Sequence, residues 1–214
     1  MKPLLQIALD QIEQDDALEV AKLTHQFVDI IEVGTILAFS NGVRIVRTLR
    51  DLYPTHTLVC DLKTTDGGAI LSKMAFEAGT DWLTVSAAAH IATINACKLQ
   101  ADKYGGELQI EIYGNWTFEE VAAWRNLGIT QCIYHRSRDA ELAGLGWLDA
   151  DIEKMKKLSD YGIAVSITGG IVSEDIHLFK EVNAKCFIVG RALATQGGDG
   201  VAKAIRQEID KYWL

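Results

Sequence analysis

Short runs of β-branched and other apolar residues alternate along the chain with longer segments whose apolar residues lie three and four positions apart. The first pattern is typical of buried strands and the second of amphipathic helices. Each expected strand is followed by an expected helix, and the segment VAKAIRQEIDKYW supplies the last helix. The eight expected strands cover residues 4–10, 28–34, 57–63, 82–87, 108–113, 131–137, 164–170 and 186–191.

Eight repeats of strand and helix predict a (β/α)₈ TIM barrel of the α/β class. The chain of 214 residues lies near the lower limit of about 200 for this fold. A doubly wound open sheet is the structural alternative, but the segment after the first strand reads DQIEQDD and lacks the glycine-rich turn of that fold. Because no linker or low-complexity tract interrupts the chain, we expect residues 1–214 to form a single barrel domain.

Capping residues mark several of the expected helix ends. Thr117 and Glu120 have the spacing of a capping box, and Ser40–Asn41 and Ser173 stand where two other helices are expected to begin. Left-handed C-caps are expected where glycines follow helices, at Gly79, Gly128 and Gly162.

The formal net charge of −8 argues against a general nucleic-acid-binding protein, which needs a basic face. A small anionic substrate stays possible, because a local cluster of donors can oppose the overall field. The first residues, MKPLLQIALD, do not resemble a signal peptide, and no apolar run is long enough to span a membrane. We therefore expect a cytoplasmic protein. The four cysteines are scattered singly and are interpreted as inert core thiols.

Ionisable residues stand near the carboxyl ends of several strands, on the face that looks into the barrel. In the third strand, Asp61 and Lys63 share a face with Val59, whereas Cys60 and Leu62 face the helices. The same alternation places four more ionisable groups on the inner face: Asp10, Glu32, Glu111 and His135. A structural network of buried ion pairs is the alternative, but the carboxyl end is where barrel active sites lie, and the convergence favours a functional site.

Glycines follow the seventh and eighth strands, in TGG (168–170) and VGR (189–191). Loops at these two positions of a barrel commonly bind a phosphate through backbone N–H groups. Arg191 would add a charge-assisted contact. The two tripeptides together predict a phosphate site.

The segment DLKTTDGG, residues 61–68, resembles the Asp-x-Lys-x-x-Asp motif shared by the orotidine 5′-phosphate decarboxylase suprafamily. The segments ALD, VDIIEVGT, QIEIYGNW, YHRSRDAELAGLGW and SITGGI resemble more narrowly the 3-keto-L-gulonate 6-phosphate decarboxylases. The resemblance runs through nearly the whole chain, and YHRSRDA is its most discriminating piece.

The resemblance implies a homodimeric barrel with active sites at the interface and a dependence on Mg²⁺. It also implies release of CO₂ from a β-keto acid sugar phosphate, giving L-xylulose 5-phosphate through an enediolate, in L-ascorbate-type sugar acid catabolism. The implied metal ligands are Glu32 and Asp61. The implied catalytic residues are Lys63, Asp66 reaching across from the partner subunit, Glu111, His135 and Arg138. The implied substrate contacts are Asp10, Thr168, Gly170, Gly190 and Arg191.

These residue types suit the reaction. Decarboxylation of a β-keto acid leaves charge on an oxygen, which a hard cation held by carboxylates, or a lysine ammonium, can stabilise. We expect Asp61 and Asp66 to keep Lys63 charged, and His135 to deliver a proton to carbon. Arg136 is expected, from strand parity, to face solvent or an interface.

Three alternatives stay open at this point. A 3-hexulose 6-phosphate synthase would join formaldehyde to ribulose 5-phosphate through a similar enediolate, but YHRSRDA fits that family poorly. Orotidine 5′-phosphate decarboxylase works without a metal and matches this chain at the shared motif alone. A non-catalytic barrel that binds a sugar phosphate would not need the cluster of Asp61, Lys63 and Asp66.

Overall fold

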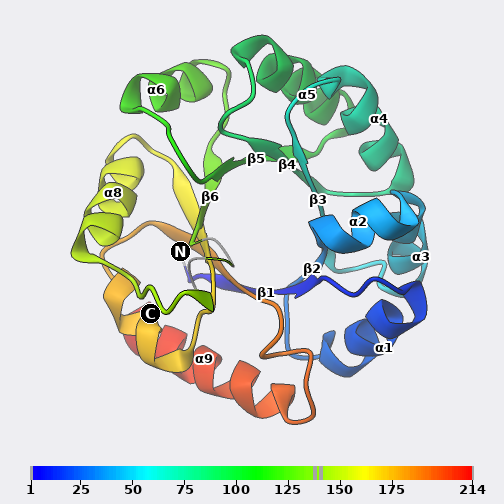
Figure 1. The fold of residues 1–214 in the computed structure, drawn as a ribbon, viewed down its shortest axis with the longest axis vertical. Helices are drawn as coiled ribbons and strands as arrows, with labels where there is room; N and C mark the ends of the chain where they lie inside the picture. The colour runs from blue at the N-terminus through cyan, green and yellow to red at the C-terminus, as the bar shows by residue number, and fades with distance from the viewer. Residues whose placement is uncertain (1, 137–138, 140–141, 214) are drawn as a thin grey trace.

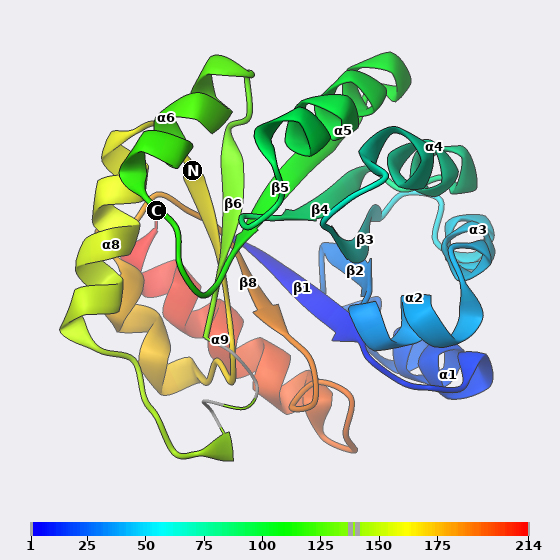
Figure 2. The same ribbon diagram turned by 45° about the horizontal axis from the view of Figure 1, so that its top comes forward.

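A computed structural model describes residues 2–136, 139 and 142–213 of the chain. Eight parallel strands close into a barrel in sequence order, and helices form an outer layer around it (Figures 1 and 2). The predicted (β/α)₈ barrel is confirmed. The strands are β1 (Leu4–Leu9), β2 (Ile30–Val33), β3 (Thr57–Thr64), β4 (Trp82–Ser86), β5 (Glu107–Ile112), β6 (Gln131–His135), β7 (Ala164–Thr168) and β8 (Ala184–Val189).

The α-helices of the outer layer are α1 (Gln14–Thr24), α2 (Thr35–Asn41), α3 (Arg44–Leu52), α4 (Gly68–Ala78), α5 (Ile91–Tyr104), α6 (Phe118–Asn126), α8 (Asp149–Asp160) and α9 (Gly198–Tyr212). The segment between β7 and β8 is a 3₁₀ helix, η1 (Ser173–Phe179). Strand β1 pairs with both β2 and β8, which closes the ring. In the part of the chain that the structure describes, no helix is both long enough and apolar enough to cross a membrane.

Strand alternation divides the buried apolar residues into two clusters. The larger cluster lies between the barrel and the helices and includes Ile31 and Cys60, whereas a small cluster inside the barrel includes Ile30, Val59 and Ile133. Successive residues of one strand therefore belong to different cores, as the period of two requires. The predicted inner and outer faces are confirmed. All four cysteines are buried and free, and burial raises the pKa of Cys186 to about 12.

The structure differs from the sequence prediction at two helix starts. Ser40 and Asn41 do not begin a helix: they end α2, and their side chains donate to the carbonyl of Ile12 at 2.8 Å each. Gly42, with φ of 68°, then breaks the chain direction, so the helical pattern of this region is split into α2 and α3. Ser173 is the first residue of η1 and not its cap.

Other helix ends agree with the sequence. The capping box of Thr117 and Glu120 is formed at the start of α6. Three glycines that follow helices adopt positive φ angles, as predicted: Gly79, Gly128 and Gly162.

Candidate active site

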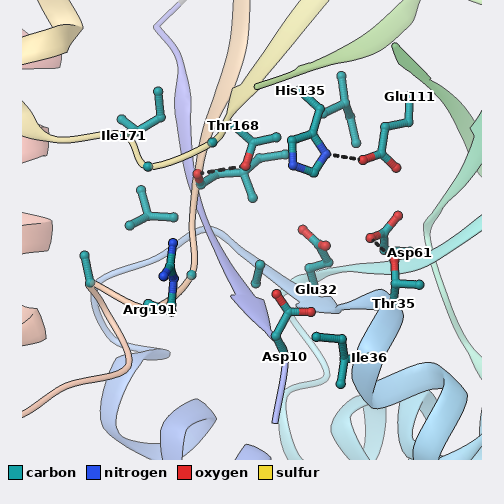
Figure 3. Close-up of a pocket in the computed structure, with 18 of the residues that line it drawn as sticks. Asp10, Glu32, Thr35, Ile36, Asp61, Glu111, His135, Thr168, Ile171 and Arg191 are labelled. Atoms are coloured by element: carbon teal, nitrogen blue, oxygen red, sulfur yellow. Dashed lines mark hydrogen bonds and ion pairs between the residues drawn. The ribbon is translucent and has the colours of Figure 1, made fainter. Parts of the chain in front are cut away.

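A cavity of about 450 Å³ opens at the carboxyl ends of the strands (Figure 3). Its walls include every predicted site residue that the structure describes except Asp66, so most of the predicted residues do converge. The predicted residues that line it are Asp10, Glu32, Asp61, Lys63, Glu111, His135, Thr168, Gly170, Gly190 and Arg191.

Lys63 adopts a left-handed backbone conformation, with φ of 46°, the one positive φ among the described non-glycine residues. The register between β3 and β4 shifts here, because the five residues from Cys60 to Thr64 lie opposite only three residues of β4, Leu83 to Val85. The Lys63 N–H donates to the Thr84 hydroxyl at 2.9 Å. A strained backbone at a charged, inward-facing residue is typical of a functional site.

The Lys63 ammonium is held between two buried carboxylates. Its Nζ lies 2.8 Å from Glu111 Oε2 and also forms an ion pair with Asp61. Burial alone would lower the pKa of Lys63, but Asp61 and Glu111 outweigh it and raise the pKa above its ordinary value. The lysine is therefore charged at neutral pH.

Three side chains donate hydrogen bonds to the Asp61 carboxylate. Its oxygens accept from the hydroxyls of Thr35 and Thr84 at 2.6 Å each, and from the Lys63 ammonium. Burial would raise the pKa of Asp61, but Lys63 and these hydrogen bonds hold it below the ordinary value. Asp61 is therefore ionised across the physiological range.

Glu32 lies beside Asp61 and Asp10 at the same end of the cavity (Figure 3). Burial raises its pKa well above the ordinary value, and the neighbouring Asp61 raises it further. The Gln6 amide donates to it from inside the barrel. Gly34 follows β2 here, where a Cβ atom would come within 2.3 Å of Asp10 Oδ1, so a side chain at this position would displace Asp10.

His135 and Glu111 form a pair across neighbouring strands, with Nδ1 2.5 Å from Oε1 (Figure 3). An ionised carboxylate only accepts, so this contact places the proton on Nδ1 and leaves Nε2 for a ligand. Burial raises the pKa of Glu111, and Asp61 adds to the increase. One carboxylate thus orients both the lysine and the histidine.

The other end of the cavity is built from the loops after β7 and β8. Gly169 and Gly170 have φ of 110° and 62°, and they line the cavity with Gly190 and Arg191. Figure 3 shows Arg191 on the opposite side of the cavity from Glu111. Backbone N–H groups and a guanidinium at one end, and carboxylates at the other, give the cavity two ends of opposite chemistry.

One predicted residue in the described part of the chain lies away from the cavity. Asp66 is exposed in the turn before α4 and does not line the cavity, so Glu111, and not Asp66, is the second carboxylate that pairs with Lys63. Arg138 lies outside the described residues.

Sequence reasoning missed two kinds of residue. Arg136 was expected to face solvent or an interface, but its guanidinium binds the carbonyls of Gly169 and Gly170. It follows the last residue of β6, where alternation no longer predicts direction. Thr35 and Thr84, which hold Asp61, also escaped notice, because a threonine in a strand or at a helix start gives no signal of its own.

The fold and the cavity define a (β/α)₈ barrel with a charged pocket at the carboxyl ends of its strands, where barrel enzymes have their active sites. A family model described as "Orotidine 5'-phosphate decarboxylase / HUMPS family" matches residues 3–206. The chain belongs to this family.

Individual relatives match over their whole length. The chain is 56% identical to the "Probable 3-keto-L-gulonate-6-phosphate decarboxylase" of Haemophilus influenzae, covering 100% of this chain and 99% of the relative. It is 63% identical, with a TM-score of 0.96, to the crystal structure of 3-keto-L-gulonate-6-phosphate decarboxylase from Vibrio cholerae, with 100% of both chains covered. A ligand complex of KGPDC from Streptococcus mutans is 37% identical with a TM-score of 0.97, again over 100% of both chains.

Proposed function

We propose that this chain is a carboxy-lyase that converts 3-keto-L-gulonate 6-phosphate into L-xylulose 5-phosphate and CO₂, in sugar acid catabolism of the L-ascorbate type. The observation that carries the proposal is the charged Lys63 between Asp61 and Glu111 at the mouth of the barrel. Relatives that share this barrel over their full length bear the name of that activity.

The reaction breaks the bond between the carboxylate carbon and the neighbouring carbon. The electron pair of that bond moves onto the ketone oxygen and gives an enediolate as CO₂ leaves. The Lys63 ammonium is a preorganised positive charge for this oxygen, because its two carboxylates fix its place before substrate binds. The ammonium therefore does not have to move or change its partners when negative charge develops on the ketone oxygen.

A proton must then reach the carbon that lost CO₂. His135 lines the cavity, and its contact with Glu111 through Nδ1 turns Nε2 toward the substrate. In the imidazolium form, in which both ring nitrogens carry a proton, Nε2 can donate directly or through a water. Arg138, by resemblance, assists this step. The net change replaces a carboxylate with hydrogen and needs no oxidant or reductant.

The carboxylates of the cavity fit a divalent cation. The cavity has four carboxylates but one lysine; the carboxylates are Asp10, Glu32, Asp61 and Glu111. Glu32 is buried beside like charges, which raises its pKa, and a bound cation would reduce this repulsion. Among the described residues, no group of three or more His, Cys, Asp or Glu side chains forms a complete metal site, so substrate or water would supply further ligands. We propose that Glu32 and Asp61 hold Mg²⁺, which when bound adds positive charge near the substrate oxygens.

The phosphate would bind at the opposite end, at Gly170, Gly190 and Arg191. Glycines let a phosphate approach the backbone closely, and the Arg191 guanidinium can neutralise its charge. Asp10, beside Glu32, and Thr168, the last residue of β7, also line the cavity and would contact the hydroxyl groups of the sugar acid.

The proposed reaction is tested by CO₂ release from 3-keto-L-gulonate 6-phosphate by the purified protein with Mg²⁺. We expect metal-dependent release. Consumption of formaldehyde and ribulose 5-phosphate, with no release of CO₂, would instead assign the synthase activity. A protein that is silent in both assays but binds a sugar phosphate would be a non-catalytic binding barrel.

We further propose a homodimer whose active sites lie at the interface. Exposed apolar side chains on α2 and α4 support this, with Phe39 81%, Ile70 69% and Met74 46% exposed. Ile70 and Met74 lie four residues apart on α4 and so share one face, and an exposed apolar face commonly marks a contact with another protein. Asp66 is exposed immediately before α4, where it could reach a partner's cavity.

A mixed dimer of Asp66→Ala and Lys63→Ala subunits tests this arrangement. Each variant alone should be nearly inactive. If Asp66 acts across the interface, one of the two sites in a mixed dimer has both residues intact. Random pairing should then restore about a quarter of wild-type activity. Activity is measured after co-expression with two different tags. Failure of the mixed dimers to regain activity would show that Asp66 serves its own subunit.

A further inference from the structure

Arg136 occupies a place that the reaction above does not use. Its Nε donates to the carbonyl oxygen of Gly169 at 2.9 Å, and its Nη2 donates to the same oxygen and, at 3.3 Å, to that of Gly170. Its backbone N–H donates to Thr168 at 3.1 Å. One arginine thus bonds to the carbonyls of three successive residues: the last residue of β7 and the two glycines that follow it.

The guanidinium is itself held in place. It lies over the ring of Trp147, with Cζ 4.8 Å from the ring centroid. Trp147 in turn contacts Phe179, whose ring centroid is 5.2 Å away in an edge-to-face arrangement. A planar cation stacked on an anchored indole keeps its donor fork in one orientation.

The peptide geometry shows what this contact does to the loop. Among the described residues all peptide bonds are trans, so each carbonyl points opposite to the N–H of the next residue. Arg136 attracts the carbonyls of Gly169 and Gly170, and it therefore turns the N–H groups of Gly170 and Ile171 away from itself. Arg136 does not line the cavity, whereas Gly169, Gly170 and Ile171 do. The two N–H groups are therefore directed to the cavity side.

Two further observations agree with this arrangement. No hydrogen bond to another described residue uses the N–H of Gly170 or Ile171, so both are available to a ligand. A Cβ atom at Gly169 would lie 2.2 Å from the Arg136 carbonyl oxygen, so this glycine permits the close approach of the two segments.

We infer that Arg136 is a positioning residue that aims the N–H groups of Gly170 and Ile171 at the substrate phosphate without touching the phosphate itself. The inference rests on the proposed function only in taking this end of the cavity as the phosphate site. Its specific content is that affinity for a phosphate depends on a side chain behind the loop.

The test compares Arg136→Ala and Arg136→Lys with wild type in two measurements. Inorganic phosphate binding, followed by calorimetry, reports on the loop without any turnover. Steady-state kinetics with 3-keto-L-gulonate 6-phosphate then separate KM from kcat. We expect R136A to raise the phosphate Kd and the KM about tenfold, equivalent to about 1.4 kcal/mol, with kcat changed less. R136K should recover part of the affinity, because an ammonium can donate to one carbonyl but cannot bridge two.

Arg125→Ala is the matched control. Arg125 also donates to a backbone carbonyl, that of Ile129 at 3.2 Å, but it does not line the cavity. Its loss should leave phosphate affinity and KM unchanged. Thermal unfolding of all variants separates misfolding from a local effect.

Two results would overturn the inference. In the first, R136A keeps its phosphate affinity and its KM within twofold of the wild-type values. This would show that the loop after β7 keeps its conformation without Arg136. A fall in kcat at unchanged KM would assign Arg136 to the chemical step beside His135. If the protein proves not to decarboxylate this substrate, the calorimetric comparison still decides the role of Arg136.

Discussion

Replacing Lys63 with alanine is expected to lower kcat about 10²- to 10³-fold, with KM changed only a few-fold. The ammonium contributes when charge develops on the ketone oxygen, which happens in the transition state and not in the bound substrate. The variant also leaves Asp61 and Glu111 close together without their shared cation. Steady-state kinetics with 3-keto-L-gulonate 6-phosphate measure both constants.

Lys156→Ala is a suitable control for this variant. Lys156 is also held between two carboxylates, 3.1 Å from Glu153 and 2.7 Å from Glu181, but it lies on the outer helix layer. Its replacement should leave kcat unchanged. A Lys63→Ala protein that folds, binds inorganic phosphate and turns over at the wild-type rate would remove the lysine from the mechanism.

Chelation of divalent metal with EDTA is expected to abolish CO₂ release, and added Mg²⁺ should restore it. Glu32→Gln removes one proposed ligand charge while keeping the side chain's size, so it should raise the Mg²⁺ concentration for half-maximal activity at least about tenfold. The reason is the buried, mutually repelling pair of Glu32 and Asp61, which a divalent cation stabilises. The measurement is initial rate against free Mg²⁺.

Glu107→Gln provides the comparison. Glu107 is also a strand glutamate, but it begins β5 at the opposite end of the barrel and accepts from Gln131 at 2.6 Å. Its Mg²⁺ dependence should equal that of wild type. An unchanged Mg²⁺ requirement in Glu32→Gln would mean that the cation binds elsewhere or that none is used.

The fold and most of the cavity could be predicted from the sequence, because both follow from two regular patterns. One is the alternation of strands and helices along the chain, and the other is the alternation of inward and outward residues along each strand. A strand exposes alternate residues to opposite faces, so Glu32, Glu111 and His135 could be assigned to the interior from their neighbours alone. The phosphate site could be predicted for a similar reason. Counting the strands places the glycines after β7 and β8, where barrels of this type commonly bind a phosphate.

The rest depends on contacts between distant segments, which no local pattern records. The pairing of Lys63 with Glu111 joins β3 to β5 and replaced the expected pairing with Asp66. Arg136 reaches a loop more than thirty residues further along the chain. The break at Gly42 ended one helix and began another, although the apolar spacing on both sides reads as helical.

The left-handed backbone at Lys63 links the stability of the barrel to its catalytic charge at a single residue. A side chain in this conformation costs about 1–2 kcal/mol, out of a total stability of about 5–15 kcal/mol for a typical protein. Glycine would adopt the same angles without that cost, but it would remove the ammonium. It would also leave Asp61 and Glu111 buried without their shared cation, which costs about 3–5 kcal/mol, more than the strain that glycine relieves. The ion pairs that place the ammonium in the active site are therefore also what hold the strained backbone at position 63.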